Sequence, residues 1–250
     1  TGERAILLGG VYGIIEALFE FYKTKNFNNK DTYHMTANYI SGELSSEISK
    51  NGLLQTYNTY QNKDLFKQYY SIYYLKFYHL IKLIYSQVES GVEITDVINN
   101  NNNELDKLNK SNIWEQINMI NTNKSYMNFN SYKEHVSAVY MAAIMAQVDV
   151  LLEKGHCMSE IINESIIEAT DSLNPYMNTK GIDYMIENCS MTARIGARKW
   201  HPAFKDIVSK NEMYNINTDK KVNGYYNINF EKQFINHPVH ESFKMINNIK

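Results

Sequence analysis

The sequence has few cysteines, few prolines and little net charge, and each shortage excludes a class of protein. Its two cysteines, Cys157 and Cys189, have the spacing of neither a zinc site nor a disulfide framework, so both are expected to be free thiols. Three prolines and eleven glycines in 250 residues favour helices over a β fold dense in turns. A net charge of −2 gives no basis for binding nucleic acid or an anionic membrane.

No apolar run is expected to be long enough to cross a bilayer, and the first residues are not expected to be a signal peptide. The longest run, residues 5–19, contains Glu16 and is shorter than the roughly 20 residues that a span requires. This run predicts a helix that is buried on every side. Gly9, Gly10 and Gly13 disfavour a helix interior, so another helix or a ligand is expected to approach this backbone closely.

A phosphate-binding loop is absent as well. An alternative interpretation makes the first residues a strand and places Gly10 and Gly13 in a dinucleotide loop, but the fingerprint requires a glycine where Leu8 stands. No series of alternating strands and helices follows. The sequence therefore predicts an all-α fold, and these 250 residues alone are not expected to bind a dinucleotide tightly.

The most informative segment is an amphipathic helix expected at residues 159–173. Its apolar stripe comprises Ile162, Ile166, Ala169 and Leu173, and its acidic side comprises Glu160, Glu164, Glu168 and Asp171. Ile161 and Ile167 border the acids, so the carboxylates are expected to be partly buried. Burying like charges is costly unless a cation is present, and hard divalent cations take oxygen ligands. The alternative is an ordinary solvated acidic face.

The remaining segments are also expected to be helical, with polar connections. Residues 32–49, after an N-cap at Asp31, and the aromatic-rich residues 65–86 are assigned to helices, the latter to the core. A second apolar helix begins near Val136 and stops at Gly155. A turn is expected at Asn174 and Pro175. The segment past Lys210 is polar, with apolar islands at two phenylalanines, Phe230 and Phe234.

The chain shows a weak internal repetition. VYGIIEALFEFY, from Val11, parallels VYMAAIMAQVDVLL, from Val139, and TYHMTANYISGEL parallels IINESIIEATDSL. This alignment divides the chain into a first half at about residues 1–98, an Asn-rich surface connection at about 99–130 and a second half at about 131–250. The first copy has no counterpart of Glu164 and Glu168, so only the second copy is expected to bind metal.

Three motifs carry a resemblance to a known family. GERAILLGGVYGIIEALF, GHCMSEIINESIIEATDSLNPYM and GIDYMIENCSMTARIGARKW resemble the C-terminal domain of ketol-acid reductoisomerases (acetohydroxyacid isomeroreductases) in their long, plant-type form. The resemblance is dense over residues 1–25 and 139–202 and poor over 99–135 and beyond 210. It implies an all-α knotted domain built from two related halves, and an N-terminal Rossmann domain that this chain lacks.

The resemblance also implies the site residues. Glu3, of the GER motif, together with Glu164 and Glu168 matches the ligands of two Mg²⁺ ions, and the family's bridging aspartate would lie four residues before Glu3. Ser190 matches the serine that holds the substrate carboxylate. Leu8 and Leu173 match the leucines that bound the alkyl group. Carboxylate and hydroxyl ligands without His or Cys suit Mg²⁺.

The implied reaction converts 2-acetolactate or 2-aceto-2-hydroxybutyrate to 2,3-dihydroxy acids by Mg²⁺-assisted alkyl migration and reduction with NADPH, in branched-chain amino acid biosynthesis. The implied partners are the N-terminal NADPH-binding domain and a second subunit of a homodimer, in a plastid-type compartment. Tyr12 departs from the family, where plant-type relatives usually have histidine.

Two alternatives remain. A di-iron carboxylate bundle would need two Glu-x-x-His pairs, and the sequence offers one, at Glu153 and His156, interrupted by Gly155. A non-catalytic all-α scaffold or interaction domain with a solvated acidic helix is the other.

Overall fold

Every regular element that the structure describes is a helix. The structure is a computed structural model, and it describes residues 5–100, 113, 132–210 and 228–248, in which no strand occurs. This confirms the all-α prediction. Segments labelled η are π-helices, whose backbone hydrogen bonds reach five residues back. In chain order the elements are η1 (Ala5–Gly10), α2 (Val11–Thr24), α3 (Asn29–Tyr33), η2 (His34–Leu44), α4 (Ser45–Asn58), α5 (Lys63–Glu89), α6 (Val92–Asn100), α8 (Tyr132–Glu153), α9 (Met158–Ile162), η3 (Asn163–Leu173), α10 (Asn174–Lys180), α11 (Ile182–Glu187), α12 (Met191–Ser209), η4 (Glu231–Ile235) and α13 (Val239–Asn247).

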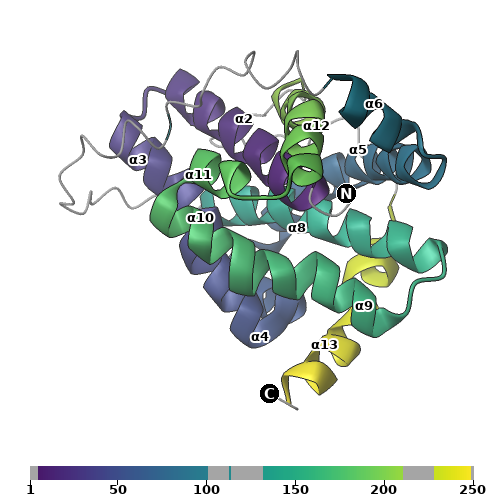
Figure 1. Cartoon of the computed structure of the whole chain (residues 1–250). Helices are drawn as coiled ribbons and strands as arrows, with labels where there is room; N and C mark the ends of the chain where they lie inside the picture. Colours follow the sequence, from purple (N-terminus) through teal and green to yellow (C-terminus); the bar gives the residue numbers. More distant parts are fainter. Residues whose placement is uncertain (1–4, 101–112, 114–131, 211–227, 249–250) are drawn as a thin grey trace.

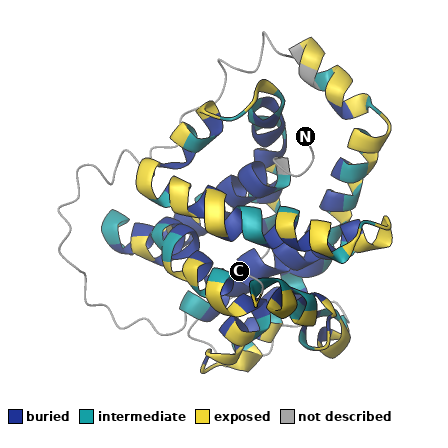
Figure 2. Cartoon of the chain, turned by 60° about the horizontal axis from the view of Figure 1, so that its bottom comes forward, coloured by how far each residue is buried: buried dark blue, intermediate teal, exposed yellow. Residues whose placement is uncertain are grey.

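Helix α8 lies at the centre, packed along α5 and buried over most of its length (Figures 1 and 2). The expectation that no apolar run is long enough to cross a bilayer is wrong for this helix, which is the one described helix long and apolar enough to do so. Most of its apolar stretch is nevertheless buried inside the fold, as in a core helix. Gly155 has a φ of +84°, and the amide of His156 donates to the carbonyl of Leu151 across it. This bond closes a Schellman motif, so the expected stop at Gly155 is confirmed.

The aromatic residues of α5 form a core with the last part of the chain. Phe66 and Tyr70 are buried on α5, and each ring contacts both Phe230 and Phe234. The stripe is therefore core, as the sequence predicts. The segment that contains the two phenylalanines, expected as a polar tail, instead folds as η4 and α13 against this core.

The glycines at the start of the chain lie against α12. A Cβ atom at Gly9 would be 2.6 Å from the carbonyl oxygen of Ala197, and one at Gly13 would be 2.5 Å from that of His201. The close approach expected from the sequence is therefore that of a helix. Gly9 faces Ala197 and Gly13, four residues later, faces His201, which is also four residues later. The contacts advance in the same direction on both elements, so η1 and α2 run parallel to α12.

The two π-helices η2 and η3 occupy equivalent positions in the internal repetition. Each has 11 residues and each runs directly into an α-helix, α4 or α10. Each π-helix packs against both of these α-helices. The residues that follow the two π-helices, Ser45 and Asn174, are equivalent in the alignment, and Nδ2 of Asn174 donates to Oγ of Ser45 over 2.9 Å. This arrangement is consistent with two related halves. The division into halves and the knot both stay predictions.

The prediction of a turn at Asn174 and Pro175 is wrong, because the helix continues through both residues. The amide of Asn174 donates to the carbonyl of Ala169, five residues back, and α10 continues the helix with Pro175 in its first turn. Proline has no amide hydrogen, and in an α-helix its ring clashes with the carbonyl four residues back. A position where π-type bonding changes to α-type bonding relieves both constraints. The chain turns instead at Gly181, where φ is +90°.

Two further boundaries differ from the sequence-based expectation. The helix expected after Asp31 begins earlier, because Asn28 is its N-cap and its Oδ1 accepts from the amide of Asp31. The Asn-rich connection begins inside α6, which extends to Asn100. Most of that connection lies outside the described residues; Ile113, which is described, is buried.

The core also encloses a titratable group, His135 of α8. Its Nδ1 lies 2.9 Å from the hydroxyl of Tyr22, and the rings of Phe21 and Tyr69 pack against it. Its Nε2 is buried, and no described residue forms a hydrogen bond with it. Burial therefore lowers the pKa of His135 to about 3. Burial also lowers the pKa of His240 to about 4.

Stability should fall as the pH drops below the ordinary histidine pKa of about 6.5. Between that pH and about 3 the unfolded chain binds a proton at His135 and the folded chain does not, so unfolding is favoured by acid. In His135→Gln the slope of unfolding free energy against pH should decrease by about 1.4 kcal/mol per pH unit between pH 6 and 5. The part of the slope that comes from His240 should remain. Urea titrations across this range measure the slope. An unchanged slope would show that His135 is protonated in the fold.

Candidate functional site

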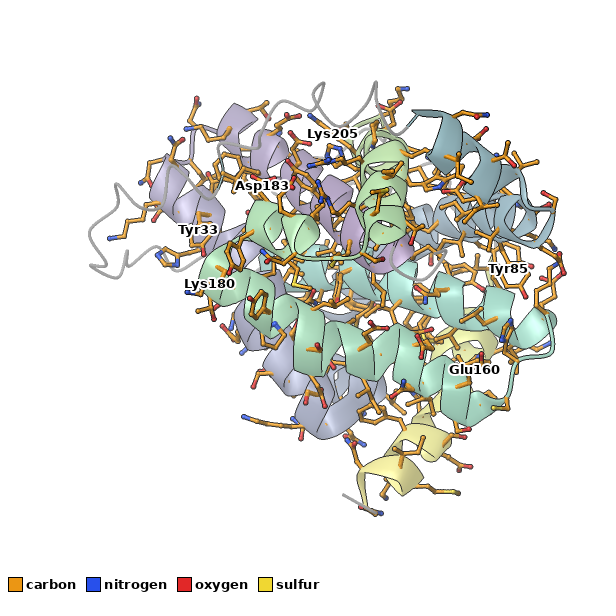
Figure 3. All side chains as sticks on the ribbon, in the orientation of Figure 1. Tyr33, Tyr85, Glu160, Lys180, Asp183 and Lys205 are labelled. Carbon is orange, nitrogen blue, oxygen red and sulfur yellow. The ribbon has the colours of Figure 1, made fainter. Side chains whose placement is uncertain are left out.

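Helix η3 presents the acidic side chains as the sequence predicts. Ile162, Ile166 and Leu173 are buried toward the core, while Glu164 and Glu168 are half-buried. Glu160, one turn earlier, is exposed and contacts His156, with 3.1 Å between Oε1 and Nδ1. The partial burial expected for carboxylates between isoleucines is thus confirmed for the two glutamates that the resemblance assigns to metal. In Figure 3 the continuous helix of α9, η3 and α10 runs between the labelled residues Glu160 and Lys180, which lie at its opposite ends.

The π-helical form of η3 was not anticipated from the sequence. Its wider turn accommodates one more residue than an α-turn, and such segments occur frequently at functional sites. Nδ2 of Asn163 donates to Oε1 of Glu164 over 3.1 Å, which orients one carboxylate. Asn163 is therefore a residue beside the site that sequence reasoning missed. A hydrophobic pattern of about 3.6 residues reports which side is buried, and it carries no signal for a π-turn.

Two of the predicted residues lie on π-helices that contact each other. Leu8 of η1 is fully buried, Leu173 of η3 is 5% exposed, and η1 packs against η3. Glu3 lies outside the described residues, two positions before the start of η1. The structure thus brings the element after Glu3 to the helix that carries Glu164 and Glu168.

Ser190 is the N-cap of α12. Its Oγ accepts from the amide of Ala193 over 3.4 Å and lies 3.3 Å from the hydroxyl of Thr192, and the residue is exposed. Because η1 and α12 run parallel, Ser190 lies at the same end of this helix pair as the start of η1. The positive end of the helix dipole is located there, which favours an anion near the Ser190 hydroxyl.

Sequence reasoning also missed a charged cluster next to Ser190. Glu187, the last residue of α11, pairs with Arg194 over 3.1 Å and with Arg198, both on α12. All three residues stand within the motif that carries the resemblance. Spacings of seven and eleven residues across a helix boundary gave no indication that these charges meet.

The donor set fits Mg²⁺ in part. Within the described ranges no three His, Cys, Asp or Glu side chains converge, so the described contribution is the pair Glu164 and Glu168. Two half-buried carboxylates supply oxygen ligands, which favour a hard cation over zinc or copper. The single Glu-x-x-His pair forms no di-iron site, because Glu153 pairs with Lys82 and His156 lies 2.8 Å from the hydroxyl of Tyr85.

Comparisons with known proteins identify the family of the chain. The family described as Ketol-acid reductoisomerase, C-terminal domain, matches residues 1–127 and 133–248. The chain is 34% identical over 253 residues to the chloroplastic ketol-acid reductoisomerase of Spinacia oleracea, covering 96% of this chain and 42% of that protein. It is 33% identical over 257 residues to the chloroplastic enzyme of Pisum sativum, covering 98% and 43%.

A shorter and stronger match concerns one part of the chain. The mitochondrial ketol-acid reductoisomerase of Saccharomyces cerevisiae is 53% identical over 64 residues, which cover 26% of this chain and 16% of that protein. The chain spans about two fifths of the length of the chloroplastic relatives that it matches over nearly its whole extent. With an all-helical fold and a family match along almost the entire sequence, the chain belongs to the ketol-acid reductoisomerase family, as its C-terminal domain.

Proposed function

We propose that this chain forms the metal- and substrate-binding part of a ketol-acid reductoisomerase. The reaction converts 2-acetolactate or 2-aceto-2-hydroxybutyrate to a 2,3-dihydroxy acid, with alkyl migration followed by reduction with NADPH, in the biosynthesis of valine, isoleucine and leucine. The observation that carries the proposal is the half-buried pair Glu164 and Glu168 on η3, beside the π-helix that follows Glu3.

Glu3, Glu164 and Glu168 would hold two Mg²⁺ ions. When bound, the ions supply Lewis acid polarisation of the substrate ketone and stabilise its alkoxide. The protein contributes a fixed set of carboxylates on a packed helix. Because Ile162 and Ile166 anchor η3 in the core, Glu164 and Glu168 keep their positions with little loss of side-chain freedom on binding.

Ser190, Leu8 and Leu173 would orient the substrate. The Ser190 hydroxyl and the positive end of the α12 dipole suit the substrate carboxylate, which is an anion. Leu8 and Leu173 offer apolar side chains from two contacting helices, and these would bound the migrating alkyl group. The substrate carboxylate would thus bind at the end of a helix, and the alkyl group would bind between two helices.

The partners are proposed on the same basis. NADPH would be bound mainly by the N-terminal part of the enzyme, and the active unit would be a homodimer. Two relatives that match nearly the whole of this chain are chloroplastic, which supports a plastid-type compartment for this protein. The alternative, a non-catalytic scaffold with a solvated acidic helix, gives no reason for the partial burial of Glu164 and Glu168 or for Ser190 to lie at the η1 end of α12.

The activity is tested with the full-length enzyme. Purified protein given 2-acetolactate, NADPH and Mg²⁺ should oxidise NADPH, and chelation of the metal should stop the reaction. The control substrate is a 2-hydroxy acid without a ketone, which should give no oxidation. Absence of metal-dependent turnover by correctly folded protein would reject the proposal in favour of the scaffold.

Leu173→Ala in the full-length enzyme should shift substrate preference toward the larger 2-aceto-2-hydroxybutyrate. One methylene in such a pocket is worth about 1–3 kcal/mol, so the ratio of the two kcat/KM values should change roughly 10- to 100-fold. Ile162→Ala, on the same buried stripe, is the matched control and should lower stability without altering the ratio. An unchanged ratio in Leu173→Ala would remove this residue from the substrate pocket.

A further inference from the structure

The turn that carries Ser190 is short and lies between two helices. Three residues, Asn188, Cys189 and Ser190, separate α11 from α12. The amide of Cys189 donates to the carbonyl of Ile186, and Nδ2 of Asn188 donates to the carbonyl of Tyr184. These bonds tie the turn back to α11. The position of Ser190 therefore depends on how α11 is fixed relative to the first turns of α12.

Glu187 provides that connection. One of its oxygens accepts from Nη2 of Arg198, and the other lies 3.1 Å from Nη2 of Arg194. Ser190, Arg194 and Arg198 are spaced four residues apart, so they lie along one face of α12. A single carboxylate at the end of α11 is thus bound to two consecutive turns of the face that begins with Ser190.

The burial of the arginines makes this connection stronger than an ordinary surface ion pair. The side chains of Arg198 and Arg194 are 12% and 29% exposed, whereas that of Glu187 is 48% exposed. Nη1 of Arg198 and Nε of Arg194 are buried, and neither has a hydrogen-bond partner among the residues that the structure describes. Loss of the Glu187 charge would remove the carboxylate with which both of these partly buried guanidinium groups pair, so they would have to shift toward water.

Other ion pairs hold α12 at different points along its length. Lys199 pairs with Glu93 and Asp96 of α6, and Lys205 pairs with Glu16 and Glu20 of α2. These contacts fix the middle and the C-terminal part of α12. They would persist if the Glu187 contacts were lost, so the expected change is a local displacement of the first turn.

We propose that Glu187 is a positioning residue that sets the location of Ser190 relative to η3, acting through Arg194 and Arg198. This inference rests on the proposed function, in which Ser190 binds the substrate carboxylate. Glu187 touches neither substrate nor metal. Its effect is to reduce the freedom of the Ser190 turn before substrate binds, which lowers the entropy lost on binding.

The test compares Glu187→Gln with Glu20→Gln in the full-length enzyme. Both glutamates are about half exposed and both pair with a basic residue of α12, but Glu20 lies far from Ser190. Glu187→Gln should raise KM for 2-acetolactate about tenfold and leave kcat within about twofold, whereas Glu20→Gln should change neither. A purely structural role would lower kcat with the folded fraction and leave KM unchanged, and that result would overturn the inference.

A double-mutant cycle with Ser190→Ala identifies the residue through which Glu187 acts. In that background Glu187→Gln should add little to KM, because the positioned hydroxyl is already gone. If Ser190→Ala raises KM and Glu187→Gln adds its full effect, the positioning role is wrong while the proposed function stands. If Ser190→Ala leaves KM unchanged, the assignment of the substrate carboxylate fails, and the inference with it. Arg198→Lys, which keeps the charge and loses the planar fork, replaces Glu187→Gln if that variant does not fold.

Discussion

Glu164→Gln and Glu168→Gln should each reduce the conversion of 2-acetolactate by the full-length enzyme at least about 1000-fold, equivalent to about 4 kcal/mol of transition-state stabilisation. Each substitution keeps the size of the side chain and removes one negative charge and one carboxylate oxygen donor. The two glutamates are one turn apart on η3 and half-buried, and a neutral amide oxygen is a weaker ligand for a divalent cation than a carboxylate. Stopped-flow measurement of NADPH oxidation determines the loss.

The same substitutions should separate the two steps of the reaction. Alkyl migration requires an alkoxide and a polarised ketone together, whereas hydride transfer to an already rearranged 3-hydroxy-2-keto acid requires less charge stabilisation. The variants should therefore lose less activity with the rearranged keto acid than with 2-acetolactate. Equal losses with both substrates would indicate that the carboxylates support the fold or the binding of NADPH, and not the migration.

Glu160→Gln is the matched control. Glu160 is an acidic residue of the same continuous helix, one turn before Glu164, and it is exposed at the end distant from Lys180 (Figure 3). Its contact with His156 is a surface pair worth at most about 1 kcal/mol. Activity should stay within about twofold of the parent enzyme. A loss comparable to that of Glu164→Gln would mean that the helix requires negative charge in general and would contradict a specific metal site.

The sequence predicts those features that depend on burial periodicity and on strong local signals. The apolar helix α8 and its stop at Gly155 follow from composition and one glycine. The partial burial of Glu164 and Glu168 follows from their isoleucine neighbours. Each of these expectations depends on side chains within one or two helical turns. Over that distance the spacing of apolar residues in the sequence determines which side chains of a helix are buried.

Other features depend on contacts between distant parts of the chain. Periodicity does not identify the π-helices or the continuation of the helix through Pro175. It also does not identify the ion pairs of Glu187 with the two arginines of α12. The apolar islands at Phe230 and Phe234 are visible in the sequence, but their packing on α5 is not, because their partners lie about 160 residues earlier in the chain. The convergence of Glu3 with Glu164 concerns a residue outside the described ranges and stays a prediction.

Gly13→Ala should lower the free energy of unfolding by about 3 kcal/mol, corresponding to a decrease in Tm of about 6–12 °C for a chain of this size. The added Cβ would lie 2.5 Å from the carbonyl oxygen of His201 and 2.7 Å from the amide nitrogen of Lys205. Both atoms belong to the backbone of α12, so no side-chain rotation relieves the overlap and the two helices must separate. Thermal and urea unfolding of the domain measure the effect.

Gly10→Ala, within the same helical stretch, is the control. A Cβ there would lie 3.3 Å from the ring of Phe204, a side chain that can shift by a few tenths of an ångström. The helix propensity gained by replacing glycine, about 1 kcal/mol, should largely offset the remaining crowding, so stability should change by less than about 1 kcal/mol. If both variants were equally stable, the packing of α2 on α12 would be looser than the structure indicates.

The packing at Gly13 also determines the geometry of the proposed site. Because η1 and α2 run parallel to α12, their separation would move the start of η1 away from Ser190 at the corresponding end of α12. In the full-length enzyme, the folded fraction of Gly13→Ala should therefore show a raised KM for 2-acetolactate, whereas Gly10→Ala should not. A normal KM in folded Gly13→Ala protein would show that the site assembles independently of this helix pair.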